Sequence, residues 1–188
     1  MFSLFIDTTQ NYCNLAILNN ENIISKFKVK THNNLTDIVV EHIENLLNKN
    51  KLQHEDITKI LLVIGPGSFT GVRIGTLIAK TWMLIHKTSV YTIDALRLQT
   101  PHGTGLSILD ARSDSIFLAS YNHNKCLTQP NMMKEKAAES LMKKYQNHNV
   151  FIQYKSVDIF NNVIYHLKNF KKVNDVNELK PLYIKKPL

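Results

Sequence analysis

Residues 65–75 of this 188-residue chain read GPGSFTGVRIG, and this stretch decides the fold. An apolar run, ILLVI, precedes it at 60–64, and a long apolar segment follows it at 76–85. A strand, a glycine-rich turn and a helix gather backbone N–H groups at the helix N-terminus, where an anion or another stretch of backbone can approach. Four of the chain's six glycines lie within these eleven residues, so the need for backbone without side chains is concentrated here.

The loop lacks the features of the common nucleotide-binding turns. It has no GK[ST] ending, and the first lysine downstream, Lys80, lies two turns into the predicted helix. Its GxGxxxG spacing also differs from the GxGxxG dinucleotide fingerprint. Two interpretations stay open, an anion site and a close-packed turn. The pattern favours the close-packed turn, in which Gly71 and Gly75 permit tight helix contact.

Short apolar segments separated by polar turns predict the strands of the first part of the chain. They lie at 2–9, 12–19, 22–30, 59–65 and 89–93. Apolar residues at three- and four-residue spacing predict helices over 35–48 and 71–86, the second capped by Ser68 or Thr70, and a further helix begins at DALRL. The order β-β-β-α-β-α-β predicts an α/β lobe with a mixed sheet.

A stretch rich in turn residues, QTPHGTG at 99–105, follows this lobe. Beyond it the sequence predicts further strands and helices. They are a strand pair at 106–112 and 115–121, a helix at 134–145, a strand at 150–154 and a helical stretch at 156–170. The predicted domains are therefore an N-terminal lobe over 1–98, a linker over 99–105, and a reduced second α/β lobe with its tail over 106–188.

The helix over 71–86 is apolar almost all round. Between Leu77 and Ile85 only Lys80 and Thr81 are polar, so no wide polar stripe can face water. A helix of this kind needs cover on every side. One face can cover the sheet, and the other is covered either by another subunit or by more of this chain; both alternatives stay open.

Composition limits the other classes of function. The formal net charge is +8, and 20 of the 23 basic residues are lysine, which fits either a solvated surface or attraction to RNA or an acidic partner. Two distant cysteines and the absence of HxxxH and HExxH predict neither a disulfide nor a metal site. No apolar stretch reaches membrane-spanning length, and the N-terminus has no signal-peptide pattern, so a cytoplasmic protein is expected.

Asp7, Thr8 and Thr9 close the first predicted strand, where phosphate-handling folds of the actin and sugar-kinase type place an acidic loop. The alternative is a strand end whose side chains bond to adjacent backbone, and the position alone favours it. An ATP clamp of the actin class needs a glycine-rich turn in each of two lobes. No glycine follows Gly105, so the chain is not expected to form a complete clamp.

Four stretches together resemble the TsaB family of tRNA threonylcarbamoyladenosine biosynthesis proteins, part of the actin-like ATPase superfamily. They are IDTT at 6–9, GPGSFTGVRIG at 65–75, LDAR at 109–112 and PLYIK at 181–185. The resemblance is clear over 1–98 and weaker from 122 to 178. It implies an actin/Hsp70-like (ASKHA) fold, with a ribonuclease H-like first lobe of mixed sheet and a second lobe that is shortened here.

The resemblance also implies a function. It implies a non-catalytic scaffold subunit that binds and supports a catalytic TsaD-like subunit, which modifies the adenosine beside the anticodon of tRNAs that read ANN codons. It implies recruitment of a TsaE-like ATPase, an indirect relation to tRNA, and pairing with a second copy of the chain when the catalytic subunit is absent. No catalytic residue, cofactor or metal is expected in this chain. The alternative is a nucleotide-binding hydrolase or a protease-like enzyme of the same superfamily.

Two sets of residues carry these expectations. The interface with the partner is expected at Leu35, Val39, Ile43, Arg73, Leu77, Ile78 and Trp82. The glycine loop is expected to be a vestigial phosphate site formed by Asp7, Thr8, Gly65, Gly67, Ser68, Thr70 and Gly71. In the alternative enzyme, Asp7, Thr8 and the loop would hold a nucleotide or a metal.

Overall fold

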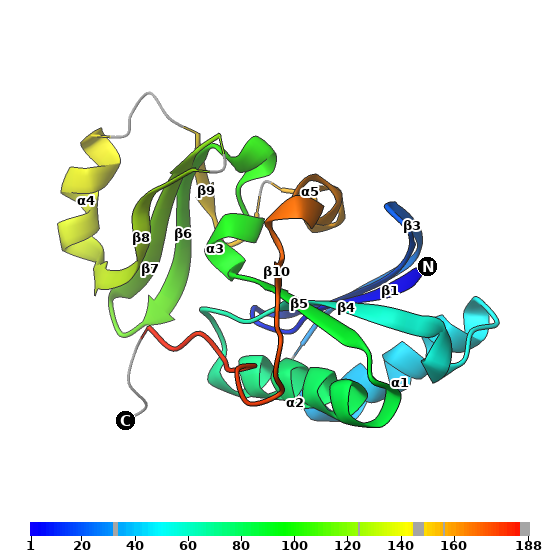
Figure 1. Cartoon of the computed structure of the whole chain (residues 1–188). Coiled ribbons are helices and arrows are strands. Elements are labelled where there is room, and N and C mark those ends of the chain that lie inside the picture. The colour runs from blue at the N-terminus through cyan, green and yellow to red at the C-terminus, as the bar shows by residue number, and fades with distance from the viewer. Residues whose placement is uncertain (32–33, 124, 145–148, 156, 185–188) are drawn as a thin grey trace.

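Two β-sheets and the helices packed on them form the structure, a computed structural model (Figure 1). It describes residues 1–31, 34–123, 125–144, 149–155 and 157–184. The strands of the first sheet are β1 (Phe2–Asp7), β2 (Tyr12–Asn19), β3 (Asn22–Lys30), β4 (Ile57–Val63), β5 (Ser89–Ile93) and β10 (Lys171–Lys172). Those of the second are β6 (Gly105–Arg112), β7 (Ser115–Asn122), β8 (Lys125–Lys134) and β9 (Val150–Ile152). The α-helices are α1 (Leu35–Lys49), α2 (Phe69–His86), α3 (Ala95–Leu98), α4 (Glu135–Lys144) and α5 (Ile159–Tyr165).

The first sheet is mixed, in the order β10-β5-β4-β1-β2-β3. Short turns join β1, β2 and β3, so these strands are antiparallel, whereas α1 and α2 are the crossovers that bring β4 and β5 parallel to β1. The predicted order of elements is confirmed, and with it the α/β class with a mixed sheet. The helix α2 begins at Phe69 because Ser68 is the cap; its Oγ accepts from the Gly71 N–H at 3.2 Å. Thr70, the other candidate cap, lies inside the helix.

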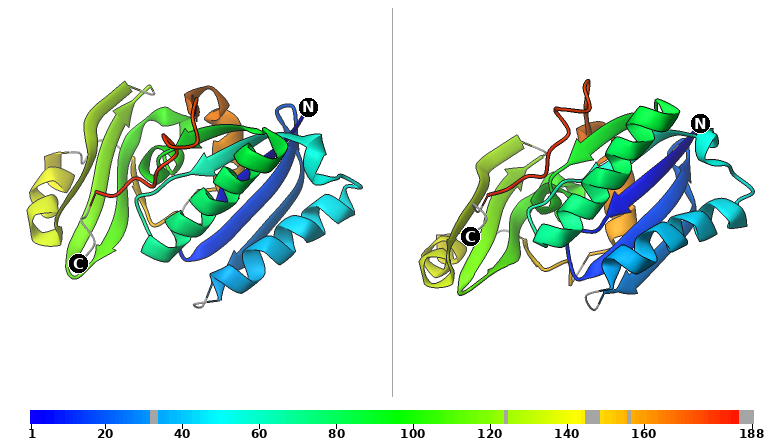
Figure 2. Two further views of the ribbon diagram at one scale, coloured as in Figure 1. Left: turned by 60° about the horizontal axis from the view of Figure 1, so that its bottom comes forward. Right: turned by 90° about the horizontal axis from the view of Figure 1, so that it is seen from below.

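Successive side chains of a strand point to opposite faces of the sheet, and in the first sheet the side chains on both faces are apolar. One face, with Leu4, Ile60 and Leu62, packs against α1 and α2, and Figure 2 shows both helices on that side. The opposite face, with Phe5 and Leu61, packs against further elements. These elements are α3, α5 and the second sheet, represented by Leu96, Phe160, Leu109 and Phe117. A single buried cluster therefore connects the two sheets.

The second sheet has the order β8-β7-β6-β9, and the predicted pair of strands, now β6 and β7, is confirmed. The sequence prediction misses β8, a polar strand that contains Pro130. Proline is tolerated there because β8 is an edge strand, where its missing N–H leaves no ladder partner unsatisfied. The predicted helices are present as α4 and α5, and α5 begins later than expected, with Asp158 as its cap. Two predicted end residues, Tyr145 and Ser156, lie outside the described residues.

The last part of the chain returns to the first sheet, although the predicted domain bounds place all of 106–188 in the second lobe. Strand β10 pairs with β5, and Leu179 belongs to the buried cluster on the α1 and α2 side of the first sheet. Further along, the Leu182 N–H donates to the Ile64 carbonyl at 2.7 Å. The chain thus crosses from the second sheet back to the glycine loop. The boundary at 99–105 stays a prediction.

No helix within the described ranges is both long and apolar enough to cross a membrane.

His166 ties α5 to the segment that joins the two sheets, and it does so as a neutral ring. It is fully buried; Nε2 donates to the Thr100 carbonyl at 2.8 Å, and Nδ1 accepts from the Asn169 side-chain amide at 3.0 Å. Burial lowers the pKa of His166 from 6.5 to about 4, and the nearby Arg97 charge acts in the same direction. Between about pH 4 and pH 6.5, therefore, the His166 ring is protonated in the unfolded chain and neutral in the folded chain.

This difference in proton uptake predicts a pH-dependent stability. Because the pKa is lower in the folded chain, the stabilisation is complete above pH 6.5 and declines as the pH falls below it. From pH 7.5 to pH 5 the free energy of unfolding should fall by about 2 kcal/mol more in the wild type than in His166→Gln. Urea unfolding of both proteins at the two pH values measures the difference. Equal pH dependence in the two proteins would contradict the neutral buried ring.

Candidate functional site

The glycine loop packs directly on the turn between β1 and β2. The Ser68 N–H donates to the Thr9 carbonyl at 2.7 Å, and the Gln10 side-chain amide donates to the Pro66 carbonyl at 3.1 Å. The start of the loop is held from the other side, because the Gly65 carbonyl accepts from the Ala95 N–H at 2.7 Å. These bonds use polar backbone groups of the loop within the chain itself.

The glycines are required by this packing. A Cβ at Gly67 would lie 2.0 Å from the Thr9 carbonyl oxygen, and a Cβ at Gly71 would lie 1.8 Å from that of Thr8. Real Cβ atoms do not approach backbone oxygens so closely. The two glycines therefore face protein backbone, and the close-packed turn accounts for both. Gly65 has a φ of +104°, a conformation that favours glycine for its own reason.

Asp7 and Thr8 are buried and bonded within the chain. The Asp7 Oδ1 accepts from the Thr9 N–H at 2.9 Å and the Thr9 hydroxyl at 2.7 Å, while Oδ2 accepts from the Asn14 side-chain amide at 3.4 Å. The Thr8 hydroxyl donates to the Gly71 carbonyl at 2.7 Å. Burial raises the pKa of Asp7, partly opposed by these bonds. The arrangement is the local side-chain-to-backbone turn that the sequence offered as the alternative to an acidic phosphate loop.

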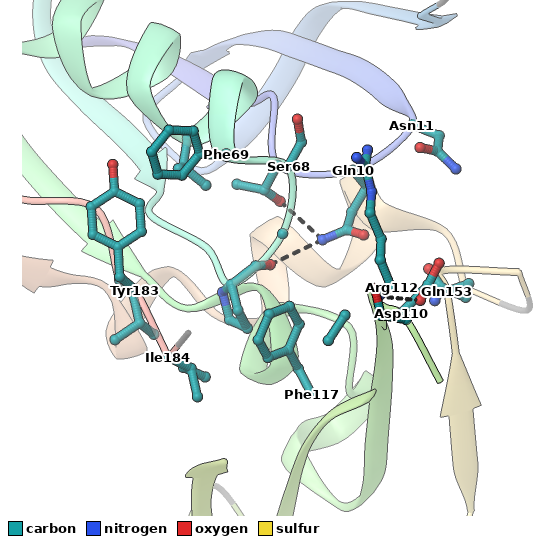
Figure 3. Close-up of a pocket in the computed structure, with 17 residues that line it drawn as sticks. Gln10, Asn11, Ser68, Phe69, Asp110, Arg112, Phe117, Gln153, Tyr183 and Ile184 are labelled. Atoms are coloured by element: carbon teal, nitrogen blue, oxygen red, sulfur yellow. Dashed lines mark hydrogen bonds between the residues drawn. The ribbon is translucent and has the colours of Figure 1, made fainter. Parts of the chain in front are cut away.

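A cavity of about 470 Å³ lies between the two sheets, beside the loop (Figure 3). Of the seven residues expected in a phosphate site, only Gly67 and Ser68 line it. Asp7, Thr8, Gly65 and Gly71 are buried, and Thr70 is exposed in the first turn of α2, away from the cavity walls. The remaining walls come from distant parts of the chain. They include Gln10, Phe69, Asp110, Arg112, Gln153 and Tyr183. The structure thus keeps an interlobe cavity but does not bring the predicted phosphate-binding side chains together in it.

The sequence pattern does not place these wall residues in a site, although four of its stretches point to them. Each of the four stretches that carried the family resemblance contributes to the cavity, namely Thr9, the loop 66–69, 110–112 and 182–184. Lys185, the end of the last stretch, lies outside the described residues. In Figure 3 Arg112 extends toward Gln10, while its backbone N–H donates to the Asp110 carboxylate at 2.6 Å.

The outward surface of α2 carries the only expected interface residues that stay accessible within the described chain. Leu77 is 66% exposed, and Leu84 and Ile85, at spacings of seven and eight residues, are 68% and 67% exposed. At the helix N-terminus the Arg73 guanidinium lies 3.6 Å over the Phe69 ring and donates to the Tyr183 hydroxyl at 3.0 Å. We call Arg73, Leu77, Leu84 and Ile85 the α2 surface.

The other expected interface residues lie in or against the core of the free chain. Leu35, Val39, Ile43 and Trp82 are buried in the chain's own core, where α1 and α2 meet the first sheet. A side chain that already packs inside the chain cannot anchor a partner without unfolding. Ile78 is half-buried against the same core. The interface stays a prediction, now for the α2 surface.

The described residues contain no group of three or more His, Cys, Asp or Glu side chains placed to hold a metal ion.

Comparison with known proteins gives consistent relatives. Residues 28–151, more than half of the chain, match the family model described as TsaD: tRNA N6-adenosine threonylcarbamoyltransferase. The uncharacterized protein MG208 of Mycoplasma genitalium is 29% identical over all of this chain and 96% of its own length. The tRNA threonylcarbamoyladenosine biosynthesis protein TsaB of Bacillus subtilis is 31% identical over 69% of this chain and 58% of its own length.

Among solved structures, YeaZ from Pseudomonas aeruginosa aligns with a TM-score of 0.73 at 14% identity, covering 97% of this chain and 99% of its own. At this identity the likeness shows the fold, which extends over both sheets. The family model and the Bacillus subtilis relative indicate the family to which the chain belongs. The chain therefore belongs to the family described as TsaD: tRNA N6-adenosine threonylcarbamoyltransferase, as a member of its TsaB branch.

Proposed function

We propose that this chain is a non-catalytic subunit of the machinery that forms threonylcarbamoyladenosine on tRNA, and that it binds and supports a TsaD-like catalytic subunit. The observation that carries the proposal is the α2 surface. Three aliphatic side chains, each about two-thirds exposed, lie on one side of one helix. Contiguous exposed apolar surface of this kind is typical of a protein interface.

The energetics favour a partner on this surface. Burying one exposed leucine or isoleucine contributes about 1.5–3 kcal/mol, and the α2 surface offers three such side chains. The entropy cost of association offsets part of this gain, so the surface forms the apolar centre of a larger interface. Arg73, held against Phe69 and Tyr183, supplies an ordered cation at its edge. This layout, with an apolar centre and a polar rim, is typical of stable subunit contacts.

The resemblance to TsaB proteins supports the identity of the partner, and it extends the proposal to a TsaE-like ATPase recruited by the assembled pair. A second copy of this chain would cover the α2 surface when the catalytic subunit is absent. Co-expression with the TsaD-like protein of the same genome, followed by affinity purification through a tag on that protein, tests the pairing. Failure to recover this chain would contradict the proposal.

The rival function, a nucleotide-binding hydrolase, rests on the interlobe cavity. The residues that would hold the nucleotide argue against this function. Asp7 is buried, and the loop glycines face the carbonyls of Thr8 and Thr9. We therefore expect calorimetric titration of the isolated chain with ATP and Mg²⁺ to give no saturable heat. Low-micromolar binding that is lost in Arg112→Gln, a variant of the cavity wall, would support the rival instead. Gly67→Val is unsuitable, because its side chain would displace the Thr9 backbone.

A further inference from the structure

Lysine residues alternate along β3, and their side chains lie on one face of the first sheet. Lys26, Lys28 and Lys30 are all exposed, while Phe27 and Val29 between them pack toward α1. Alternate residues of a strand are about 7 Å apart, so the three ammonium groups form a spaced row. Tyr12, opposite Lys30 on β2, shares their face and is 38% exposed. We call these four residues the β3 lysine row.

Aromatic rings hold two of the ammonium groups in place. The Lys28 Nζ lies 4.9 Å from the centre of the Tyr12 ring, and the Lys26 Nζ lies 5.2 Å from that of Phe160 on α5. A cation over a ring keeps its full charge and its free N–H donors. The ammonium groups of Lys26 and Lys28 are therefore held in position, and their charge is not neutralised.

Carboxylates do not neutralise the row. The ion pairs found among the described residues join His54 to Glu44, His86 to Glu55 and Arg97 to Asp94, and none of them includes a lysine. Lys26, Lys28 and Lys30 therefore contribute to the formal net charge of +8 without an ion-pair partner among the described residues. A row of fixed positive charges with an exposed aromatic ring is the pattern that follows a nucleic-acid backbone, since the ring offers a stacking surface to a base.

The row lies away from the proposed docking surface. Both α1 and α2 cover one face of the first sheet, and Lys26, Lys28 and Lys30 project from the opposite face at the β3 edge. Figure 1 shows β3 at the free edge of the sheet, beside α5. A subunit that covers α2 therefore leaves the row accessible.

From this geometry we infer that the β3 lysine row binds the phosphate backbone of RNA. The inference rests on the proposed function, which names that RNA as the tRNA on which the complex acts. Two other roles explain part of the pattern. Lysines on an edge strand prevent pairing with another sheet, and positive charge attracts acidic proteins. Neither of these roles needs an aromatic ring beside the lysines, whereas the part of Tyr12 that Lys28 leaves exposed offers a base a stacking surface, which is why RNA is favoured.

The test compares two triple variants of the full chain. One, Lys26→Gln, Lys28→Gln and Lys30→Gln, removes the row; the control, Lys136→Gln, Lys143→Gln and Lys180→Gln, removes three exposed lysines elsewhere. Each is purified with the TsaD-like subunit, and binding of a labelled tRNA transcript is measured across a series of salt concentrations. Each lysine lost from a phosphate contact lowers the slope of log K against log salt by about 0.7–0.9. The row variant should therefore lose about two units of slope, and the control none.

The outcomes separate this inference from the proposed function. Recovery of both variants in the complex tests the pairing, and the salt slope tests the RNA contact. Equal slopes for the row variant and the control would overturn the inference, as would unchanged tRNA binding with loss of an acidic protein partner. The matching Lys→Arg triple variant should keep the wild-type slope, because it keeps the charges. If the Gln triple variant only self-associates while its slope stays unchanged, the row protects the edge and the inference fails.

Discussion

A Leu77→Asp variant is expected to lose its TsaD-like partner while the chain stays folded. Leu77 is 66% exposed on α2, so a carboxylate there stays in water in the free chain and costs little. In the complex the same carboxylate would be buried without a partner, and the apolar contact of the leucine would also be lost. Together these effects should weaken binding by at least about 100-fold. Affinity purification through the TsaD-like subunit, with circular dichroism of the free variant, measures both parts.

The control is Leu127→Asp, which places the same charge on a 51% exposed leucine of β8, in the other sheet. This variant should bind the partner as the wild type does. Ile78→Asp is a poor probe, because Ile78 packs against the chain's own core and its loss would destabilise the fold. If Leu77→Asp still co-purifies with the TsaD-like subunit, the docking surface is misassigned.

Gly71→Ala is expected to be strongly destabilising, although it adds a single methyl group. Alanine normally stabilises a helix by about 1 kcal/mol relative to glycine. Here its Cβ would lie 1.8 Å from the Thr8 carbonyl oxygen, and α2 would have to move away from the end of β1. That movement also breaks the bond from the Thr8 hydroxyl to the Gly71 carbonyl. A net loss of about 3–5 kcal/mol in the free energy of unfolding should result, as measured by urea unfolding.

Gly75→Ala, one turn further along α2, is the matched comparison. Its Cβ would meet the Thr8 Oγ1 at 2.8 Å and the Leu62 Cδ1 at 3.2 Å, which are side-chain atoms and not backbone. Part of the clash is relieved by side-chain adjustment, so the loss should stay within about 1–2 kcal/mol. Equal effects of the two substitutions would show that contact with the Thr8 backbone does not explain the glycine loop.

Local sequence patterns predicted most of the first sheet, because its strands and crossover helices follow one another along the chain. The spacing of apolar residues could not indicate which face of α2 packs against the first sheet, because the helix is apolar almost all round. Trp82 was therefore expected at the interface, whereas it is buried beside α1. Leu77, from the same helix, is exposed.

Features made by distant residues were the hardest to predict. Arg112 and Tyr183 line the interlobe cavity with Gln10 only because the tail returns to the first sheet, and the two-residue strand β10 gives no recognisable pattern. The bonds of Asp7 to Thr9 and Asn14 are local by contrast, and the sequence pattern favoured such a turn. The glycine pattern indicated that another group lies close to the backbone of the loop. It did not indicate that this group would be the Thr8 and Thr9 carbonyls.

The proposed function requires that this chain form a stable complex with the TsaD-like subunit. The most direct measurement is the mass in solution, by light scattering, of an equimolar mixture of this chain and the TsaD-like subunit. We expect a particle that contains one copy of each and is absent when this chain carries Leu77→Asp. Two separate species, each with the mass it has alone, would contradict it.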